Sequence, residues 1–430
     1  MPSDTPRIAV IGSGIAGLTA AWLLRKEADV TLFEAGPRAG MGAYAVDYES
    51  HGSTTRIDIP LRIFCRGYYN NLLSLYEALG VRAIQSDHAG VFADSAGRIL
   101  LHYGTLRIGD FRLPYLKPDS LLSGRAWRLA SASRRFFRRV KTDARASDRF
   151  REMSFADYLE SLSTPQDFID SALLPILSVT CTCDYACVLR YPADIMIDYL
   201  AGGIHDFGVM YAEGGVDNIV PRLLEGTQLR TNAPVQAVRP TGDGLQLELQ
   251  DGSGAHFDHV IVAAQAHQAA AILQDFPDRV PLLERVPFET SELCIHTDER
   301  VMPGRPGRSS PVAYTLPADH QRAQVSVDMT RAFSRFRDQA PVFQTWHPVI
   351  DIPAERELAR ASFTRPVVTR ESRDAVLALQ TLQRQTANRL WLCGAYMTDR
   401  VPLLDAAVQS AMRVASSLGA GIPWSATGED

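Results

Sequence analysis

Residues 8–34 constrain the fold of this chain more than any other segment, because they read as a strand, a glycine turn, a helix and a second strand that ends in an acid. The segment IAVIGSGIAGLTAAWLLRKEADVTLFE carries the spacing G-x-G-x-x-G at Gly12, Gly14 and Gly17. The first glycine allows a tight turn, the second lets a pyrophosphate approach the backbone, and the third lets the helix pack closely on the sheet. This order of elements predicts a dinucleotide site rather than a purely structural turn.

The two ends of this unit indicate how a dinucleotide is held. The helix begins at Ile15 and Ala16, and its free N–H groups are expected to point toward the phosphates. Glu34 ends the second strand, where a carboxylate accepts hydrogen bonds from both ribose hydroxyls of an adenosine. A 2′-phosphate at that position meets charge repulsion.

The residues after the acid indicate whether the motif binds FAD or NAD. Residues 34–40 read EAGPRAG, which resembles the extended FAD fingerprint of the flavin-containing amine oxidase and phytoene desaturase superfamily. In that fingerprint the acid is followed by an Arg and a glycine pair; Gly40 matches the first glycine, and Met41 replaces the second. The resemblance implies noncovalent FAD with contacts at Ala35 and at Arg38, the latter near the pyrophosphate. An ordinary surface side chain is the alternative for Arg38.

A second segment resembles the adenine side of this FAD domain. The pair Gly214–Gly215 precedes a predicted helix over 217–224 and a strand centred on Val235. The resemblance implies that the backbone of Val235 contacts the adenine. Residues 258–264, DHVIVAA, predict a buried parallel strand because they are apolar and rich in β-branched residues.

A third segment, near the C-terminus, resembles the last flavin-binding motif of the superfamily. The sequence RLWLCGAYMTDRVPLLDAAVQSAMRVASSLG predicts a strand, a glycine turn and a final helix. The resemblance places Gly394 and the helix start near Leu404 beside the flavin. A helix N-terminus there stabilises negative charge that develops during reduction.

Together the three segments predict an α/β fold. We expect a Rossmann-like FAD-binding domain of the three-segment, glutathione-reductase and amine-oxidase type, with an inserted α+β substrate domain. We assign residues 1–85, 210–285 and 385–430 to the FAD-binding domain, and residues 86–209 and 286–384 to the substrate-binding domain. The length of 430 residues exceeds one compact core and agrees with two packed domains.

A closer resemblance extends over nearly the whole chain. The chain is similar to a bacterial subgroup of the superfamily, the amine-oxidase-like predicted NAD/FAD-binding proteins found near cyclopropane fatty acid synthases, in the stretches IDIPLRIFCRGYYNNLLSLYEALGV, RYPADIMIDYLAGG, ELCIHTDERVMP, QVSVDMTR and RLWLCGAY. Two segments that border the flavin depart from the subgroup. Asp58 is followed by Ile59 and Pro60 rather than by Gly and an aromatic residue, and MTDRVPLL replaces a Gly-Phe-His-Glu-like stretch. These departures indicate a diverged substrate chemistry beside a retained cofactor site.

The lysine content argues against an ordinary amine oxidase. Many amine oxidases of the superfamily use a lysine, late in the second substrate segment, to hold a water at the flavin. This chain has only three lysines, Lys26, Lys117 and Lys141, so none is available there. Candidate replacements for a base are three histidines, each also compatible with a structural role: His205, His267 and His296.

Three residues are candidate catalytic groups because their motif positions lie nearest the flavin: Arg62, Tyr396 and Asp399. Arg62 carries a permanent charge that can hold a carboxylate or a developing flavin anion. Tyr396 is a candidate ring wall or proton donor. Asp399 is either a base or the cap of the last helix. Phe64 is expected to pack in the core.

Composition excludes several classes of protein. A hydrophobic fraction of 46%, a charged fraction of 22% and a net charge of −5 are ordinary for a globular protein and give no reason to expect nucleic acid as a partner. No apolar run approaches the length of about 18 residues that a membrane helix needs. The start MPSDTPR lacks the pattern of a secretory signal, so a cytoplasmic location is expected.

The six cysteines do not predict a metal site. Three of them lie in TCTCDYAC, whereas zinc and iron–sulfur sites usually need four ligands, often as paired clusters, and no second cluster exists. Buried or pocket-lining thiols are the expectation. Cys393 precedes Gly394 near one flavin edge, and noncovalent binding is still expected.

The stretch 125–151 is strongly basic, with nine arginines and one lysine against two aspartates. Leu129, Ser133, Phe136 and Val140 recur at helical spacing and form an apolar stripe. Such a helix is either a solvated face packed on the substrate domain or a contact surface for an anionic membrane or an acyl carrier protein.

The resemblance and the absent lysine favour an FAD-dependent oxidoreductase. We expect it to remove hydride from a largely apolar small molecule, such as a lipid, acyl or polyketide-like substrate, by desaturation or a related dehydrogenation. Three alternatives stay open: a flavin-dependent isomerase or cyclase without net redox, an amine oxidase, and a non-catalytic flavoprotein that stabilises a partner complex.

Overall fold

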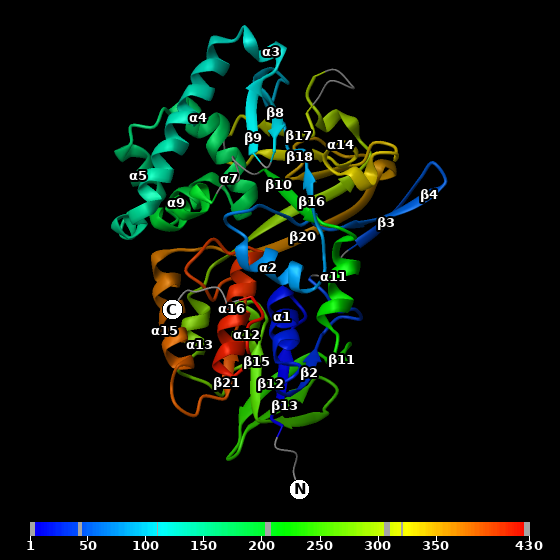
Figure 1. Cartoon of the computed structure of the whole chain (residues 1–430), viewed down its shortest axis with the longest axis vertical. Helices are drawn as coiled ribbons and strands as arrows, with labels where there is room; N and C mark the ends of the chain where they lie inside the picture. Colours follow the sequence, from blue (N-terminus) through cyan, green and yellow to red (C-terminus); the bar gives the residue numbers. More distant parts are fainter. Residues whose placement is uncertain are drawn as a thin grey trace.

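The structure is a computed structural model that describes residues 5–41, 45–109, 111–202, 208–304, 310–319 and 321–424. It has two halves stacked along the long axis (Figure 1). One half is built on a parallel sheet that contains the first strand of the chain. The other half is built on a larger, mostly antiparallel sheet with a layer of helices beside it.

The parallel sheet has five strands, in the order β11 (Gln228–Arg230), β2 (Asp29–Phe33), β1 (Arg7–Ile11), β15 (His259–Val262) and β21 (Leu390–Leu392). Neighbouring strands pair in parallel, and β1 lies in the middle between β2 and β15. The strands come from three separated segments of the chain. The expected Rossmann-like α/β fold is therefore confirmed.

Both faces of this sheet are covered, which explains the near-continuous apolar character of its strands. Ile8, Val10 and Ile261 belong to a core formed with helices α1 (Ile15–Leu24) and α16 (Leu404–Ser417). Ala9 and Val262 lie on the opposite face and pack with helices α12 (Ala266–Ile272) and α15 (Arg370–Gln383). Alternate residues of a strand point to opposite faces, so one strand serves two cores.

A three-stranded antiparallel sheet extends this half, with strands β12 (Val235–Pro240), β13 (Leu245–Leu249) and β14 (Gly254–Phe257). Helix α13 (Val280–Glu284) follows and packs against α12 and α15. Helix α15 lies within the segment 286–384 that we assigned to the substrate domain. It nevertheless packs on α13 and β21, in the half that contains the parallel sheet (Figure 1).

The second half contains an eight-stranded sheet, in the order β20 (Glu357–Pro366), β16 (Phe288–His296), β19 (Phe343–Trp346), β18 (Gln324–Asp328), β17 (Val312–Leu316), β7 (Gly90–Asp94), β8 (Ile99–Ile108) and β9 (Phe111–Leu116). All neighbours are antiparallel except β17 and β7, which pair in parallel. This one pair joins the strands of the two inserted segments into a single sheet.

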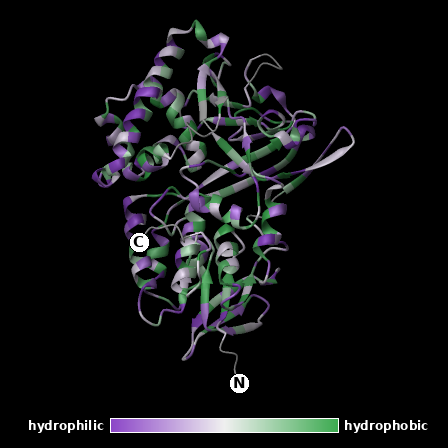
Figure 2. Cartoon of the chain, in the orientation of Figure 1, coloured by the Kyte–Doolittle hydropathy of each residue, from purple (hydrophilic) through white to green (hydrophobic). Residues whose placement is uncertain are grey.

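A helical layer accompanies this sheet, formed by α3 (Pro118–Leu121), α4 (Gly124–Asp143), the short helix η1 (Ala144–Phe150), α5 (Phe155–Ser161), α6 (Gln166–Phe168), η2 (Ile169–Leu173), α7 (Leu174–Cys181), α8 (Tyr185–Arg190) and α9 (Ala193–Ala201). The basic stretch forms α4 and η1. Leu129, Phe136 and Val140 of α4 are buried and Ser133 is half-buried, so the apolar stripe is confirmed. Hydrophilic residues, drawn in purple, alternate with the apolar positions along α4 (Figure 2).

The remaining elements between the two large sheets are the hairpin β3 (Ala45–Ser50) and β4 (Ser53–Asp58), the small sheet β5 (Ile63–Phe64), β10 (Val209–Ala212) and β6 (Ala83–Ser86), and the helices α2 (Asn70–Ala78) and α11 (Gly215–Leu223). Helix α14 (Met329–Ala332) and the short helices η3 (Glu299–Val301), η4 (Ser334–Phe336) and η5 (Ala354–Arg356) lie between strands of the eight-stranded sheet. Helix α11 confirms the helix expected over 217–224. Among the described residues, no helix has both the length and the apolar character needed to cross a bilayer.

Candidate active site

A cavity of about 460 Å³ runs between the two halves. At one end it is bounded by the turn that enters α1 and by the loop that enters α16. At the other end it is bounded by strands of the eight-stranded sheet and by helices α7 and α9. This volume lies in the range of sites for small molecules and cofactors.

The glycine turn forms a cradle for phosphate groups. Gly12 has a φ of +100°, which favours glycine. A Cβ on Gly17 would lie 2.0 Å from the carbonyl oxygen of Gly12, so the helix approaches the turn too closely for any side chain. A Cβ on Gly14, in contrast, would meet open space on the cavity side. Helix α1 has no side-chain cap, so the N–H groups near Ile15 and Ala16, which line the cavity, are available to an anion.

The acid of the motif lies against this turn. One carboxylate oxygen of Glu34 accepts hydrogen bonds from the backbone N–H of Ser13, at 3.1 Å, and from the Ser13 hydroxyl. The other accepts from the backbone N–H of Gly36 at 2.7 Å. These bonds hold the carboxylate at the mouth of the turn, where the sequence places a ribose partner.

Val235 lies near the same corner. The backbone N–H of Ala233 donates to the carbonyl of Glu34 at 3.0 Å, which ties the start of β12 to the end of β2. Val235 is half-buried and begins β12, an edge strand of its sheet. An edge strand offers unpaired backbone groups, as an adenine contact through the backbone of Val235 requires.

The rest of the fingerprint closes the turn from the other side. The backbone N–H of Gly40 donates to the Ser13 hydroxyl at 3.0 Å, and that of Met41 donates to the Ser13 carbonyl at 3.0 Å. Gly40 has a φ of +122°, and a Cβ there would lie 2.6 Å from Val220 of α11. Ala35 and Arg38 are exposed. The structure therefore leaves the Arg38 guanidinium at the surface of this corner.

The C-terminal motif supplies a second helix N-terminus at the cavity. Gly394 has a φ of +152°, and its backbone N–H donates to the Ser410 hydroxyl at 2.9 Å. Leu403 and Leu404 line the cavity at the start of α16, which has no side-chain cap. Two uncapped helix N-termini therefore border the same end of the cavity, and both favour negative charge.

A buried carboxylate fixes the start of α16. Asp405 is fully buried and accepts hydrogen bonds from the backbone N–H of Leu72 at 2.9 Å and from Asn71 at 3.2 Å. Arg400 donates to the same carboxylate at 2.9 Å and to the carbonyl of Tyr68 at 2.7 Å. Burial raises the pKa of Asp405, while Arg400 opposes this shift. This network connects α16 to α2 and keeps the helix end directed at the cavity.

Asp58 likewise fixes the start of a helix, at the Gly214–Gly215 pair. Its carboxylate accepts a hydrogen bond from the backbone N–H of Val216 at 3.1 Å, in the first turn of α11. A Cβ on Gly215 would lie 2.2 Å from this carboxylate. The second glycine of the pair is therefore required for close approach of β4 to α11.

Of the three candidate catalytic residues, Arg62 and Tyr396 line the cavity. Arg62 donates to the carbonyl of Pro60 at 3.2 Å and to the carbonyl of Met41, beside the glycine turn. Burial lowers the pKa of the Arg62 guanidinium, Asp58 counteracts this shift and Arg365 adds to it. Its charge is therefore placed at the cofactor end of the cavity.

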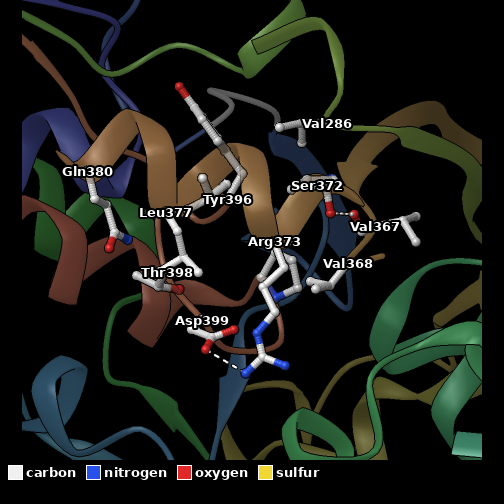
Figure 3. A pocket seen from close by; sticks show the side chains of 13 residues that line it. Val286, Val367, Val368, Ser372, Arg373, Leu377, Gln380, Tyr396, Thr398 and Asp399 are labelled. Carbon is white, nitrogen blue, oxygen red and sulfur yellow. Dashed lines mark hydrogen bonds and ion pairs between the residues drawn. The ribbon is translucent and has the colours of Figure 1, made fainter. Parts of the chain in front are cut away.

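Tyr396 is almost fully buried, and its hydroxyl has no hydrogen-bond partner among the described residues. Burial raises the pKa of this phenol strongly. The ring lies 3.0 Å from the position of a Cβ on Gly394, so it forms a wall beside that glycine. Figure 3 shows its hydroxyl directed away from Arg373 and Asp399.

Asp399 does not line the large cavity. It borders a small pocket of about 20 Å³, with room for about one water molecule, and its carboxylate accepts a hydrogen bond from Arg373 at 2.6 Å (Figure 3). Arg373 of α15 is buried and also pairs with Asp194 of α9. Arg151 approaches the same carboxylate at 3.6 Å. Asp399 is therefore an ion-pair partner of buried Arg373, and the N-cap position of α16 is occupied by Leu403 instead; a role of Asp399 as a base stays a prediction.

None of the three candidate histidines is among the described residues that line the cavity. His267 is exposed on α12 with its ring against Phe288. His296 is fully buried, bonds through Nε2 to the Thr345 hydroxyl at 2.8 Å, and accepts from the backbone N–H of Asp298 at 3.1 Å. Burial lowers the pKa of His296 to about 4. His205 lies outside the described residues.

All six cysteines are buried and free of disulfides. Among the described residues, no group of three or more His, Cys, Asp or Glu side chains is arranged to hold a metal ion. Burial raises the pKa of the Cys393 thiol to about 12, and Cys393 is not among the residues that line the cavity. Cys65 does line it, and burial raises the pKa of its thiol to about 12 as well. Both thiols are therefore poor nucleophiles.

Sequence reasoning missed several polar residues of the cavity. Arg365 enters it from β20, His88 from the approach to β7, and Gln344 from β19. Gln344 accepts a hydrogen bond from the backbone N–H of Leu61 at 2.8 Å. The only sequence signal for Arg365 is that it is the one charged residue in the stretch SFTRPVV. Phe64, expected to pack, is buried against Tyr76 and also touches the cavity.

The glycine turn with its bound acid, and the two helix N-termini that border the cavity, define a dinucleotide-dependent enzyme site. A sequence model described as flavin containing amine oxidoreductase matches residues 15–302, about two thirds of the chain. The chain belongs to this family of flavin-dependent oxidoreductases, and FAD is its cofactor. The open cradle at Gly14 and the uncapped starts of α1 and α16 fit FAD.

Solved structures share the fold over nearly the whole chain. An engineered triple mutant of a putrescine oxidase has 16% identity and a TM-score of 0.65, covering 96% of this chain and 98% of its own. A CLA-producing fatty acid isomerase from P. acnes has 12% identity and a TM-score of 0.68, with coverages of 97% and 100%. A cyclohexylamine oxidase from Brevibacterium oxydans IH-35A has 14% identity, a TM-score of 0.65 and coverages of 96% and 99%. A comparison with curated proteins gives no significant sequence match.

Proposed function

We propose that this oxidoreductase removes hydride from a largely apolar small molecule, by desaturation or dehydrogenation of a lipid, acyl or polyketide-like substrate. The lining of the cavity carries this proposal. Beyond the cofactor end it is formed mainly by aliphatic and aromatic side chains: Val179, Tyr199, Val312, Tyr314, Val325, Val327, Phe333, Trp346 and Phe363. Such a wall binds hydrocarbon by removing apolar surface from water.

The charges of the lining argue against an amine substrate. Among the described residues, the cavity is lined by two arginines and by no Asp, Glu or Lys. A protonated amine therefore finds no carboxylate, and it meets two positive charges. The lysine that holds a water in many relatives is also missing from this part of the chain.

FAD, when bound, supplies a two-electron acceptor for hydride. The chain contributes position and environment. The N-terminus of α1 is suited to hold phosphate, and the N-terminus of α16, which packs beside α1, stabilises negative charge at the same end of the cavity. Tyr396 forms a wall beside Gly394, and the apolar lining excludes water from the reacting carbon.

A flavin-dependent isomerase without net redox is the second candidate. It is supported by the structural neighbour whose name describes a fatty acid isomerase, at 12% identity. The same cavity serves both reactions, because both need an apolar substrate held beside the cofactor. Neighbours named as oxidases of putrescine and of cyclohexylamine share the fold, but none of the described residues that line this cavity carries the carboxylate that a cationic substrate would need.

Anaerobic spectroscopy of the purified FAD-bound protein tests the proposal. Pooled fatty acids, acyl thioesters and polyketide-like acids are added, and the flavin absorption band is followed. Bleaching by one pool supports hydride removal. A product formed without bleaching and without an electron acceptor identifies the isomerase, and bleaching by amines alone overturns the proposed substrate class.

A further inference from the structure

Arg365 stands out among the residues of the cavity because its charge has no partner among the described residues. It is the penultimate residue of β20 and lines the cavity. No hydrogen bond or ion pair involves its guanidinium among the described residues. Its recorded ring contact is with Trp346, whose centroid lies 5.9 Å from the guanidinium carbon.

The other arginines near this region differ from Arg365. Arg373 is paired with Asp194 and Asp399, and Arg360, on the same strand as Arg365, is paired with Glu357 and Glu292. Arg62 is satisfied in part by two backbone carbonyls. A guanidinium withdrawn from bulk water without a carboxylate is unfavourable unless a ligand or water completes its hydrogen bonds.

Arg365 lies where the side of the cavity formed by α2 and α7–α9 approaches the cofactor end, because its neighbour Thr364 bonds to Gln265 at the start of α12. Its charge acts on the phenols of Tyr69 and Tyr191 and on the thiol of Cys181, all on the α2 and α7–α9 side. Burial lowers the pKa of Arg365, and it remains a cation at any ordinary pH. Arg62, in contrast, bonds to the carbonyl beside the glycine turn. Arg365 also lowers the pKa of Arg62, so the two guanidinium groups lie near one another; Arg62 is held by backbone carbonyls, and Arg365 has no such bond among the described residues.

We propose that Arg365 binds the anionic head group, a carboxylate, of an otherwise apolar substrate. This inference rests on the proposed function and names the substrate class of the same site. The planar guanidinium fork accepts a carboxylate with two parallel hydrogen bonds, and the aromatic and aliphatic walls accept the hydrocarbon part. An amphiphile with one acidic end is the molecule that satisfies both features.

Binding of three chain-matched probes tests this assignment. Dodecanoate, dodecan-1-ol and dodecylamine are titrated into the purified FAD-bound protein, with binding followed by calorimetry and by the shift of the flavin spectrum. Dodecanoate is expected to bind best, and R365Q is expected to weaken it about 10- to 100-fold, as loss of a charge-assisted hydrogen bond implies. Binding of dodecan-1-ol is expected to change less than about twofold, because its hydroxyl does not need the charge.

Two further variants keep the test decisive. R365K retains the charge without the fork and is expected to bind dodecanoate at an intermediate strength, which also covers the case in which R365Q does not fold. R360Q, on the same strand but exposed, is the matched control and should bind dodecanoate like the parent. Dodecylamine binding as tightly as dodecanoate, or dodecanoate binding that survives both Arg365 variants, overturns the assignment. Arg365-dependent dodecanoate binding with no bleaching by any carboxylate instead retains this site and refutes hydride removal.

A second, independent observation concerns the exposed surface of residues 106–127. Seven of the exposed large apolar side chains of the described chain fall in this short range: Leu106, Ile108, Leu113, Tyr115, Leu121, Leu122, Trp127. Leu106 pairs with Leu113 across β8 and β9, so the four residues on these strands share one face. Leu122 is 97% exposed and Trp127 is 55% exposed, which is unusual for a surface in contact with water alone.

Basic side chains lie next along the chain. Arg128, Arg134, Arg135 and Arg138 are exposed on α4, and α4 packs against β8 and α3. An exposed apolar group beside a row of cations matches the interface of an anionic lipid bilayer, where apolar side chains enter the acyl region and arginines meet head groups. We infer that these seven exposed apolar side chains, together with the exposed arginines of α4, form a surface that docks on an anionic membrane.

Vesicle sedimentation distinguishes this partner from others. The protein is expected to sediment with phosphatidylcholine vesicles containing a quarter of phosphatidylglycerol and to stay in solution with phosphatidylcholine alone. The double variant L122S/W127S should weaken sedimentation at least about fivefold, whereas L377S, an exposed leucine of α15, should not. Equal binding to both vesicles, or a surface occupied instead by a second copy in ultracentrifugation or by an acyl carrier protein in a binding assay, overturns the membrane assignment.

Discussion

The cofactor end and the substrate end of the cavity are built by different means. The cofactor end is made of backbone: two glycine turns, two uncapped helix N-termini, and one acid, Glu34, held by backbone N–H groups. The substrate end is made of side chains from β7, β17–β20, α7 and α9, which are distant in sequence. A diphosphate is thus bound by short local motifs, whereas the shape and charge of the substrate chamber depend on how remote elements pack.

The two ends also handle charge differently. At the cofactor end, positive potential comes from helix N-termini and from Arg62, whose hydrogen bonds go to backbone carbonyls. Arg365 of β20 adds a positive charge to the cavity that has no hydrogen-bond or ion-pair partner among the described residues. Substitutions in the backbone motifs should therefore reduce cofactor retention and leave ligand selectivity nearly unchanged. Substitutions of side chains in the substrate chamber should change ligand selectivity and leave cofactor retention nearly unchanged.

The largest expected effect is at the glycine turn. In G17A the new Cβ would lie 2.0 Å from the carbonyl oxygen of Gly12, so the helix must shift away from the sheet. Overpacking of this kind is expected to reduce bound FAD by about tenfold or more and to lower the melting temperature. The ratio of flavin to protein absorbance measures the loss. G242A, where a Cβ meets nothing within 4 Å, is the matched control, and equal FAD content in the two variants contradicts the cradle.

The second effect concerns the acid of the motif. E34Q keeps the shape but loses the charge-assisted bonds with Ser13 and Gly36, and FAD affinity is expected to fall roughly 10- to 100-fold. Reconstitution of the apoprotein with FAD, followed by fluorescence, measures the affinity. E27Q, an exposed acid of the same motif region, should bind FAD normally. Full FAD retention by E34Q on gel filtration shows that the carboxylate does not hold the ribose.

The third prediction concerns the contact between the halves at Arg373. D194N removes the buried partner of Arg373 and is expected to lower the free energy of unfolding by about 3 kcal/mol. D399N removes the more exposed partner and is expected to lower it by about 1 kcal/mol. Urea unfolding measures both. Because Asp399 does not line the cavity, D399N should retain its rate of flavin reduction; a hundredfold slower rate restores Asp399 as a base.

The smallest effect is a pH dependence that belongs to the substrate half. Burial lowers the pKa of His296 and of His347 to about 4, whereas an unfolded histidine has a pKa near 6.5. The unfolded chain therefore takes up protons first as the pH falls, and stability present above pH 6.5 is lost progressively down to about pH 4. For His296 the loss at pH 5 is about 2 kcal/mol.

Thermal unfolding between pH 7.5 and pH 4.5 measures this loss. H296Q should flatten the pH dependence, and H256Q, at a partly exposed position, should not. If the melting temperature of H296Q falls with pH as steeply as that of the parent, His296 is not the origin of the pH dependence. The ratio of bound FAD to protein should stay constant over the pH range in which the loss of stability comes from the substrate half. A constant ratio distinguishes an effect on the substrate half from an effect on the cofactor-binding half.

The sequence predicted the fold and the cofactor end well because both depend on local patterns. Gly12, Gly17 and Gly394 have backbone conformations or close approaches that only glycine permits, so their spacing in the sequence carries the information. Helix α11, which follows the Gly214–Gly215 pair, and the apolar stripe of α4 were predictable in the same way, from the periodicity of their apolar residues. Strand β15, too, is apolar because both of its faces are covered.

The substrate end could not be read in this way. Asp399 follows the last glycine motif, yet its side chain turns toward Arg373 on a helix that starts 29 residues earlier in the chain. Arg365 reaches the cavity because of its place at the end of β20, and a strand pattern alone does not say which strand lies beside it. His88 and Gln344 join the same wall from β-sheet connections far apart in sequence.

By itself the sequence determined an FAD-binding α/β fold in three segments, a glycine cradle with its acid, and the absence of a lysine beyond residue 141. Only the tertiary structure decided which charges share the cavity, and which are neutralised elsewhere. The physical reason is that backbone motifs carry their binding groups within a few residues. The charge of a cavity, in contrast, is the sum of side chains that meet only after the sheets and helices have packed.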